Sequence, residues 1–267
     1  MDQLWQDRLK FDADLEINKI SDFIRKVIEN SGSSGVVLGL SGGVDSALTA
    51  ALCAHALGPE NVLGIMMPTA FTPIEDMKDA EEVASMLGIN TERIDIDEIL
   101  KAFVSAIKTD VRSESLKIPI ANLRARIRML ILYFYANAYN YLVAGTGDRS
   151  ETLIGYFTKY GDGAADFFPI RHLYKTQVRE LARHVGIPKR IAMKPSSPQL
   201  YPGHKLSDEL PLDYDQLDLV LIGLFDLKLT PERVSQMTNV PLSIVEEILE
   251  RHRRTEHKRK SPASLIE

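Results

Sequence analysis

The sequence predicts an α/β protein in which a doubly wound, Rossmann-like parallel sheet is flanked by helices and followed by a helical C-terminal part. Two observations lead to this prediction. Short apolar runs typical of buried strands alternate with helical patterns in units of about thirty residues, as βαβ crossovers require. Beyond residue 175 the periodic patterns are helical only. The length of 267 residues can bury a sizeable core, and we expect a single domain over residues 1–267.

The first part of the chain begins with a helix and a strand. Apolar residues at helical spacing predict a helix over residues 15–30 that ends near Gly32. The apolar run GVVLGL at residues 35–40 suits a central parallel strand. The alternation continues with a helix over 47–57, a strand over 62–67, a helix over 73–87 and a strand over 93–96.

The helical pattern over residues 122–140 is unusual because its middle, MLILYFY at 129–135, is apolar on every face. We expect it to be buried on two sides, against the sheet and against a second subunit. The remaining expectations are a strand over 141–145, a Gly-rich polar segment over 146–163, a helix over 175–185, a proline-rich loop over 194–203 that can move, helices over 214–225, 231–237 and 242–253, and a basic tail over 253–260.

Composition excludes several classes of protein. A formal charge of −5 works against non-specific attraction to nucleic acid, which requires many phosphates to be neutralised. No run of 18 uncharged apolar residues could cross a membrane, and the N-terminus lacks a secretory signal, so we expect a cytoplasmic location. The single cysteine, Cys53, lies in an apolar run and reads as a buried small hydrophobic residue.

The sharpest chemical signal is SGGVDS at residues 41–46, between a predicted strand and a helix that begins near Val44. A strand that enters a helix through a Gly-rich turn directs backbone N–H groups at an anion, and the helix dipole favours the same charge. The hydroxyl groups of Ser41 and Ser46 can donate further hydrogen bonds, and Asp45 can hold Mg²⁺ between phosphates. The Walker motif and GxGxxG are both missing. We therefore expect a phosphate-binding loop of another type. The alternative is a tight turn that needs its glycines for conformational reasons alone.

SGGVDS resembles the pyrophosphate-binding loop of the ATP pyrophosphatases, which cleave ATP between the α and β phosphates. More specifically, the chain resembles the ammonia-dependent NAD synthetases from about residue 15 to residue 262. The stretches that carry this resemblance are NLRARIRM at 122–129, TGDRSE at 146–151, GYFTKYGDGAAD at 155–166, PIRHLYK at 169–175 and TEHKR at 255–259. The implied fold is that of the adenine nucleotide alpha hydrolases.

The resemblance implies roles for individual residues. Asp45 and Glu151 would bind Mg²⁺, and Lys175 would bring a mobile positive charge to ATP. Either Ser196 or Ser197 would reach ATP from the proline-rich loop; the motif favours the first and the spacing from Lys175 favours the second. The implied ATP-binding set is Gly39, Leu40, Ser41, Gly42, Gly43, Val44, Asp45, Ser46, Thr146, Lys175, Ser196 and Ser197. The set implied for the dinucleotide substrate, deamido-NAD, is Asn122, Arg126, Lys159, Asp166, His257 and Lys258.

The implied reaction is ATP-dependent amidation of deamido-NAD by ammonia through an acyl-adenylate, with Asp45, Lys175 and Asp162 as catalytic candidates. Asp162, with Asp166, could capture or deprotonate ammonium. Asp208 and Glu209 are weaker site candidates. The chain carries no recognisable glutaminase segment, so free ammonia is the expected nitrogen source, with a separate glutaminase partner as the alternative. A homodimer with substrate sites at its interface is the expected assembly. The rival functions are a tRNA-modifying ATP pyrophosphatase and a non-catalytic adenine-nucleotide sensor.

Overall fold

The computed structural model describes residues 5, 9–107, 114–195, 201 and 212–265. Its centre is a parallel sheet in the order β3-β2-β1-β4, whose strands are β1 (Gly35–Gly39), β2 (Val62–Met66), β3 (Asn90–Arg93) and β4 (Tyr141–Val143). Both neighbours of β1 run parallel to it, with Val36 opposite Val62 of β2 and opposite Leu142 of β4. The predicted parallel sheet is confirmed.

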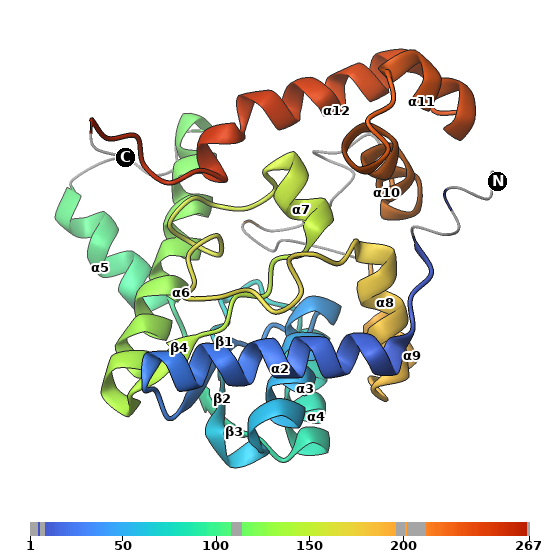
Figure 1. The fold of residues 1–267 in the computed structure, drawn as a ribbon. Coiled ribbons are helices and arrows are strands. Elements are labelled where there is room, and N and C mark those ends of the chain that lie inside the picture. Colours follow the sequence, from blue (N-terminus) through green and yellow to red (C-terminus); the bar gives the residue numbers. More distant parts are fainter. Residues whose placement is uncertain (1–4, 6–8, 108–113, 196–200, 202–211, 266–267) are drawn as a thin grey trace.

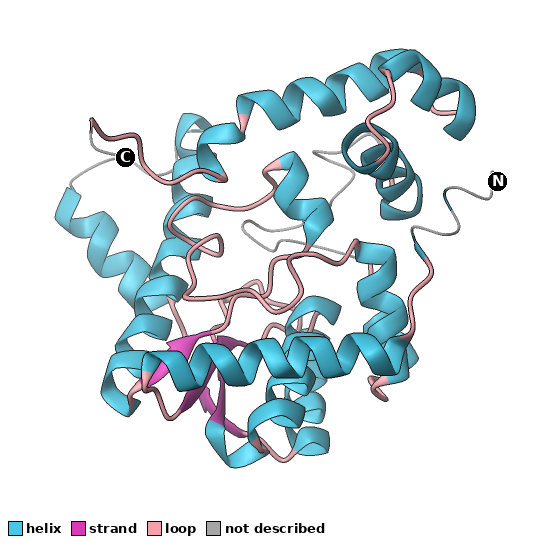
Figure 2. Cartoon of the chain, viewed as in Figure 1, coloured by secondary structure: helices cyan, strands magenta, loops and turns pink. Residues whose placement is uncertain are grey.

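Helices cover both faces of the sheet, as the doubly wound prediction requires (Figures 1 and 2). The helices and short helical turns are α2 (Ala13–Ser31), α3 (Val44–Leu57), η1 (Pro59–Asn61), α4 (Ile74–Leu87), α5 (Asp97–Ile107), η2 (Glu114–Leu116), α6 (Lys117–Tyr139), α7 (Arg149–Ile154), α8 (Lys175–His184), α9 (Lys189–Ala192), α10 (Tyr214–Leu221), η4 (Ile222–Asp226), α11 (Pro231–Thr238), α12 (Leu242–Arg254) and η5 (Glu256–Lys258).

Strand alternation assigns the two faces. Val36 and Leu38 of β1 point into a core shared with α2, α3, α4 and α8, whereas Val37 points into a second core shared with α5 and α6. A third core joins α7 to α10, α11 and α12 and contains Trp5. The helices α10, α11 and α12 around this third core form the helical C-terminal part that the sequence predicts. Cys53 lies fully buried in the first core, as expected.

Three boundaries differ from the sequence prediction. β3 spans Asn90–Arg93 instead of residues 93–96, because this edge strand has exposed side chains and the apolar signal comes from Ile94 and Ile96, which follow it. The N–H groups of these two isoleucines still donate to the carbonyl groups of Met66, the last residue of β2, and of Pro68 just beyond it, at 2.9 and 3.1 Å. Helix α6 begins at Lys117 instead of residue 122, with Pro119 in its first turn, where proline is tolerated. The segment 146–163 contains helix α7, which the glycine-rich composition obscured.

The strand order creates the crevice where a ligand is expected. β2 and β4 lie on opposite sides of β1, and the helices next to these strands cover opposite faces, because α3, which follows β1, packs in the first core and α6, which precedes β4, packs in the second. Ligands of open α/β sheets bind at such a switch point, beyond the carboxyl ends of the strands. The loop 41–46 and the segment that leads to α7 both lie there (Figure 1).

Candidate active site

The loop 41–46 links β1 to α3 and is held by its own side chains. The Ser46 hydroxyl donates to the Gly43 carbonyl at 3.0 Å and accepts from the Ser41 N–H at 3.2 Å. Gly42 has a φ of +78°, and a Cβ there would lie 2.1 Å from the carbonyl oxygen of Asp76 in α4, so only glycine fits. No side chain in the described chain caps the N-terminus of α3. The helix therefore offers its first N–H groups to an anion, as expected for a phosphate site.

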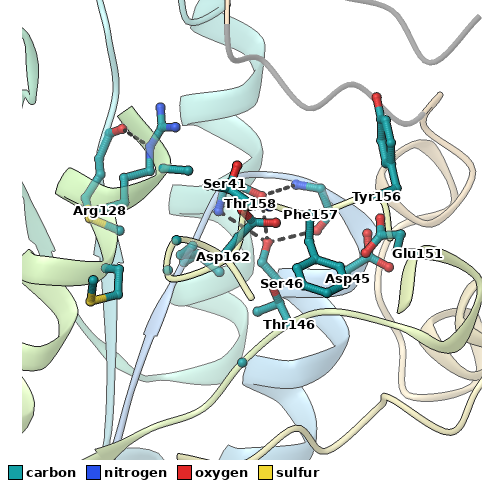
Figure 3. A pocket seen from close by; sticks show the side chains of 18 of the residues that line it. Ser41, Asp45, Ser46, Arg128, Thr146, Glu151, Tyr156, Phe157, Thr158 and Asp162 are labelled. Atoms are coloured by element: carbon teal, nitrogen blue, oxygen red, sulfur yellow. Dashed lines mark hydrogen bonds between the residues drawn. The ribbon is translucent and has the colours of Figure 1, made fainter. Parts of the chain in front are cut away.

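A cavity of about 770 Å³ opens in front of this loop. Of the residues expected at the site, the cavity is lined by Gly39, Leu40, Ser41, Gly42, Gly43, Val44, Asp45, Ser46, Asn122, Thr146, Glu151, Asp162 and Lys258. Figure 3 shows Asp45 and Glu151 close together on one side of this cavity and Arg128 on the other.

Lys175 stands at the centre of a carboxylate cluster behind the cavity wall. Its Nζ lies 2.7 Å from both carboxylate oxygens of Asp45, 2.9 Å from Glu151 Oε1 and 3.1 Å from Asp148 Oδ2. The side chain of Lys175 is 0% exposed. Lys175 is therefore enclosed and paired in this structure and does not line the described cavity wall, and its contact with ATP stays a prediction.

The protonation of this cluster follows from burial and charge. Burial raises the pKa values of the Asp148 and Glu151 carboxyl groups, and the ammonium group of Lys175 acts against that rise. Burial also acts to lower the pKa of Lys175, but the carboxylates of Asp148, Asp45 and Glu151 outweigh it and hold that pKa well above its ordinary value. Lys175 is therefore charged at neutral pH. Three carboxylates around one ammonium group leave a surplus of two negative charges when all are ionised.

A buried carboxylate on α10 holds the two helices that carry this cluster. Asp218 accepts hydrogen bonds from the Ser150 hydroxyl of α7 at 2.5 Å and from both the N–H and the hydroxyl of Thr176 in α8 at 2.8 Å. The Ser150 hydroxyl in turn accepts from the N–H of Lys175 at 3.0 Å. Asp218 thus ties the start of α7 to the start of α8, which sets the distance between Glu151 and Lys175.

Arg128 and Asp162 form the opposite part of the cavity wall. The Nε of Arg128 donates to the carbonyl of Met67, just beyond β2, at 3.2 Å, and burial lowers the pKa of its guanidinium to about 10. Asp162 is exposed to the cavity, but protein atoms enclose it on the other sides, and this desolvation raises its pKa. Its Oδ1 accepts from the N–H of Thr158 at 2.9 Å.

The residues expected to hold a dinucleotide are only partly brought together. The Asn122 side chain accepts from the Thr158 hydroxyl at 2.8 Å, and Lys258 Nζ donates to the carbonyl groups of Gly155 and Phe157 at 2.8 and 2.7 Å. Both residues line the cavity.

Four others lie away from the described cavity wall: Arg126, Lys159, Asp166 and His257. Arg126 donates to the Lys159 carbonyl, and Lys159 Nζ donates to the His257 carbonyl at 2.8 Å, so three of the four form one chain of contacts. Asp166 instead accepts from the N–H of Val143 at 2.7 Å, at the end of β4. Ser196, Ser197, Asp208 and Glu209 lie outside the described residues.

Sequence reasoning missed several residues that the structure brings to the site: Asp76, Arg128, Asp148, Thr158, Lys194 and Asp218. Lys194 contacts Asp76 and Asp79 of α4 and donates to the Gly42 carbonyl at 3.4 Å, which links the phosphate loop to the residues that follow α9. A signal for Asp148 was present, because it lies within TGDRSE, three residues before Glu151, at the N-cap position of a short helix. Asp218 has no such signal, because its role depends on the packing of α10 against α7 and α8.

Comparison with known proteins identifies a family. The family model described as NAD synthase matches residues 16–262. The NH(3)-dependent NAD(+) synthetase of Hyperthermus butylicus is 51% identical to this chain over 257 residues, or 95% of this chain and 91% of the relative. The enzyme of that name from Methanocaldococcus jannaschii is 46% identical, over 92% of this chain and 94% of the relative.

Solved structures agree with the sequence relatives. The NH3-dependent NAD synthetase from Campylobacter jejuni superposes with a TM-score of 0.80 at 33% identity and covers 96% of this chain and 100% of that chain. The NMN synthetase from Francisella tularensis gives a TM-score of 0.83 at 32% identity and covers 97% of this chain and 100% of that chain. In the described part of this chain, no helix is both long and apolar enough to cross a membrane.

Proposed function

This chain belongs to the NAD synthase family, and on that premise we propose that its cavity carries out the ATP-dependent amidation of deamido-NAD by ammonia. The products are NAD, AMP and pyrophosphate. One observation carries the assignment to this cavity: the anion-binding loop before α3 and the carboxylates of Asp45 and Glu151 share one wall. A site that cleaves ATP between the α and β phosphates needs these two features together, a cradle for pyrophosphate and a place for its counter-cation.

The reaction begins with activation of an unreactive carboxylate. An oxygen of the nicotinate carboxylate attacks the α-phosphorus of ATP, the bond to the β-phosphate oxygen breaks, and pyrophosphate leaves towards the N–H groups of the loop 41–46. The product is an acyl-adenylate. Fixed N–H donors that face the departing charge lower the barrier because they need no reorganisation.

Ammonia completes the reaction. It attacks the carbonyl carbon of the acyl-adenylate, the bond to the AMP oxygen breaks, and one proton is lost from the nitrogen. Asp162 is our candidate to receive that proton or to hold ammonium beforehand, because its carboxylate faces the cavity and its pKa is raised by desolvation. The names of the curated relatives support ammonia as the nitrogen source.

Magnesium fits the donor set at the loop. Hard cations prefer carboxylate oxygens, and Asp45 and Glu151 each retain partial exposure, with 22% and 21% of their side chains accessible. The surplus negative charge around Lys175 also favours a bound cation. Mg²⁺ held by Asp45 and Glu151 would neutralise charge on the ATP phosphates. Lys175 then serves as a positioning residue, because it orients both carboxylates and has no place on the described cavity wall.

We further propose that the enzyme is a homodimer and that the dinucleotide site lies across the interface. Leu130 and Phe134 of α6 are 62% and 69% exposed, which leaves an apolar stripe on the face turned away from the sheet. Such exposure is unusual for a monomer and typical of a surface that packs against a second copy. An interface site would also account for Arg126 and Lys159, which carry positive charge outside the cavity of the single chain.

The assay is direct. Purified protein is incubated with ATP, Mg²⁺, and either ammonium or glutamine, with deamido-NAD or nicotinate mononucleotide as the acceptor, and NAD, AMP and pyrophosphate are quantified. We expect NAD and AMP in equal amounts from deamido-NAD and ammonium, and little product with glutamine. Preference for nicotinate mononucleotide would instead align the chain with the NMN synthetase of Francisella tularensis. No amide product from either acceptor would refute the proposed reaction.

A further inference from the structure

Basic side chains at the end of the chain contact four consecutive carbonyl groups at the C-terminal end of α7. Arg259 donates to Thr152 O at 3.4 Å and to Leu153 O at 3.1 Å. The remaining contacts are His252 Nδ1 to Leu153 O at 2.6 Å, Arg251 Nε to Ile154 O at 3.1 Å and Lys258 Nζ to Gly155 O at 2.8 Å. Arg251 and His252 belong to α12, Lys258 belongs to η5, and Arg259 directly follows η5, so these contacts span 97 to 107 residues of the chain.

This arrangement adds partners for the carbonyl groups at the end of α7, of which Thr152 O also accepts from the Gly155 N–H at 3.2 Å. The last four carbonyl groups of any helix lack intrahelical partners, and α7 has only six residues, so most of its carbonyl groups are of this kind. Positive charge at this end also interacts favourably with the helix dipole. Gly155, in the left-handed conformation at φ +65°, ends the helix, and a Cβ there would lie 2.3 Å from Cβ of Thr255. The C-terminal segment therefore packs directly on the end of α7.

Helix α7 carries the carboxylate that the site requires. Glu151 lies in its middle, and the Glu151 carbonyl accepts from the N–H of Tyr156, just beyond the helix end, at 2.9 Å. A helix of this length is not stable without tertiary contacts. At its start, the Ser150 contact to Asp218 provides such a contact. At its end, the contacts come from the C-terminal segment, and Arg259 makes the largest share of them.

We propose that Arg259 is a positioning residue for Glu151. Its guanidinium donates to α7 and also to Thr255 Oγ1 at 2.9 Å and to the His252 carbonyl, so one planar group joins the end of α7 to the end of α12. Arg259 does not line the described cavity wall, so it acts through the backbone of α7 and not on a substrate. Lysine cannot reproduce this fork, because its single ammonium group lacks the spaced nitrogens. The inference rests on the proposed role of Glu151 in Mg²⁺-dependent ATP binding.

The experiment compares ATP binding to the full-length protein in Mg²⁺ and in EDTA by calorimetry, for Arg259→Met and for the matched control Arg253→Met. The side chain of Arg253 is 68% exposed and pairs with Glu250 at 3.9 Å. We expect Arg259→Met to weaken ATP binding in Mg²⁺ about tenfold, at the lower end of what loss of outer contacts costs a metal site. Binding in EDTA should change less than about twofold. Arg253→Met should match the wild type in both conditions.

A Glu151→Gln variant separates this inference from the proposed function. If Arg259 acts through Glu151, the double variant binds ATP in Mg²⁺ no more weakly than Glu151→Gln alone. Additive losses, or an equal loss in EDTA, would overturn the inference while leaving the metal role of Glu151 intact. If Glu151→Gln itself leaves Mg²⁺ dependence unchanged, the proposed metal assignment fails and the inference fails with it.

Arg259→Lys is measured alongside, so that the result does not depend on the methionine variant folding. Retention of charge without the fork should give a smaller loss in the same direction, again seen in Mg²⁺ and not in EDTA. If Arg259→Lys binds ATP like the wild type and Arg259→Met binds it more weakly, the positive charge alone makes the contact with α7, and the positioning role of residue 259 is supported. Wild-type binding by both variants overturns the inference.

Discussion

The ammonium group of Lys175 lies 2.7 Å from each carboxylate oxygen of Asp45, although the two residues are 130 positions apart in the chain. Asp45 stands in the first turn of α3, directly after the phosphate loop, and Lys175 begins α8. The contact therefore joins the loop to the segment that carries Glu151.

Replacing Lys175 by Met should destabilise the protein by about 3–5 kcal/mol, because Asp45, Asp148 and Glu151 would lose the buried cation that they share. Urea unfolding at neutral pH measures this change in the free energy of unfolding. The control is Lys260→Met. The Lys260 side chain is 68% exposed and pairs with Glu256, so this variant should change stability by less than about 1 kcal/mol. A loss of under 1 kcal/mol for Lys175→Met would contradict the prediction.

Replacing Gly42 by Ala should weaken ATP binding at least about tenfold, because the added Cβ would collide with the backbone of Asp76 and displace the phosphate loop. Gly32→Ala is the control. Gly32 also has a positive φ, of +67°, but no atom lies within 4 Å of its added Cβ, so the variant should lose about 1 kcal/mol of stability and keep its ATP affinity. Equal ATP affinities for the two variants would refute the steric argument. Calorimetry measures both.

The Cys53 thiol should stay unreactive in the folded protein, because burial raises its pKa from 9.0 to about 12. Iodoacetamide at pH 8.5 should label it only after unfolding in urea. The raised pKa of Cys53 also sets the direction in which the free energy of unfolding changes with pH. Between pH 9.0 and about 12 the unfolded chain loses this proton and the folded chain keeps it, so stability falls as pH rises. Relative to Cys53→Ala, the wild type should lose up to about 1.4 kcal/mol per pH unit in that window. A constant difference between the two proteins would be the contrary result.

Replacing Phe134 by Glu should convert the proposed dimer into a monomer, because it places a charge on the exposed apolar stripe that Phe134 forms with Leu130 on α6. Light scattering after size-exclusion chromatography gives the molar mass. Met86 of α4 is 45% exposed on another helix and provides the control, and Met86→Glu should leave the mass unchanged. A monomeric wild type would exclude the dimer outright.

Replacing Asp162 by Asn should raise the KM for ammonium about tenfold or more and leave the KM for ATP within about twofold, because the amide can neither attract ammonium nor accept its proton. Asp215→Asn is the control, since the Asp215 side chain is 71% exposed and pairs with Arg179 on the surface. Steady-state kinetics with varied ammonium measures the effect. An unchanged KM for ammonium would remove Asp162 from the nitrogen site.

Much of the fold could be predicted because its signals are local. A continuous apolar run marks the strand at residues 35–40, and helical spacing with a terminal glycine marks the helices that end at Gly32 and Gly88. The structure has each of these elements within a few residues of the prediction. β3 was misplaced because an edge strand exposes its side chains, so nothing in the hydrophobic pattern marks it. Helix α7 was missed because the glycine-rich composition of its segment obscured it and because two of its partners, Asp218 and Arg259, are distant in sequence.

The site divides in the same way. The loop 41–46 was predictable, since a phosphate cradle is built from consecutive residues whose backbone conformation follows from glycine and from the strand and helix on either side. The burial of Lys175 was not predictable, because whether a lysine side chain is mobile or enclosed depends on the residues that pack around it. Arg128 reaches the cavity and Arg126, on the same helix, does not. Only the orientation of α6 against the sheet distinguishes them.

The sequence by itself determined the fold class, the phosphate loop and the family, because each depends on residues close together in the chain. Tertiary structure alone decided which charges meet. It set Lys175 among Asp45, Asp148 and Glu151, and it joined the basic C-terminal segment to the end of α7. The physical reason is that the strength of a charge interaction depends on distance and on exclusion from water, and both are properties of the packed chain.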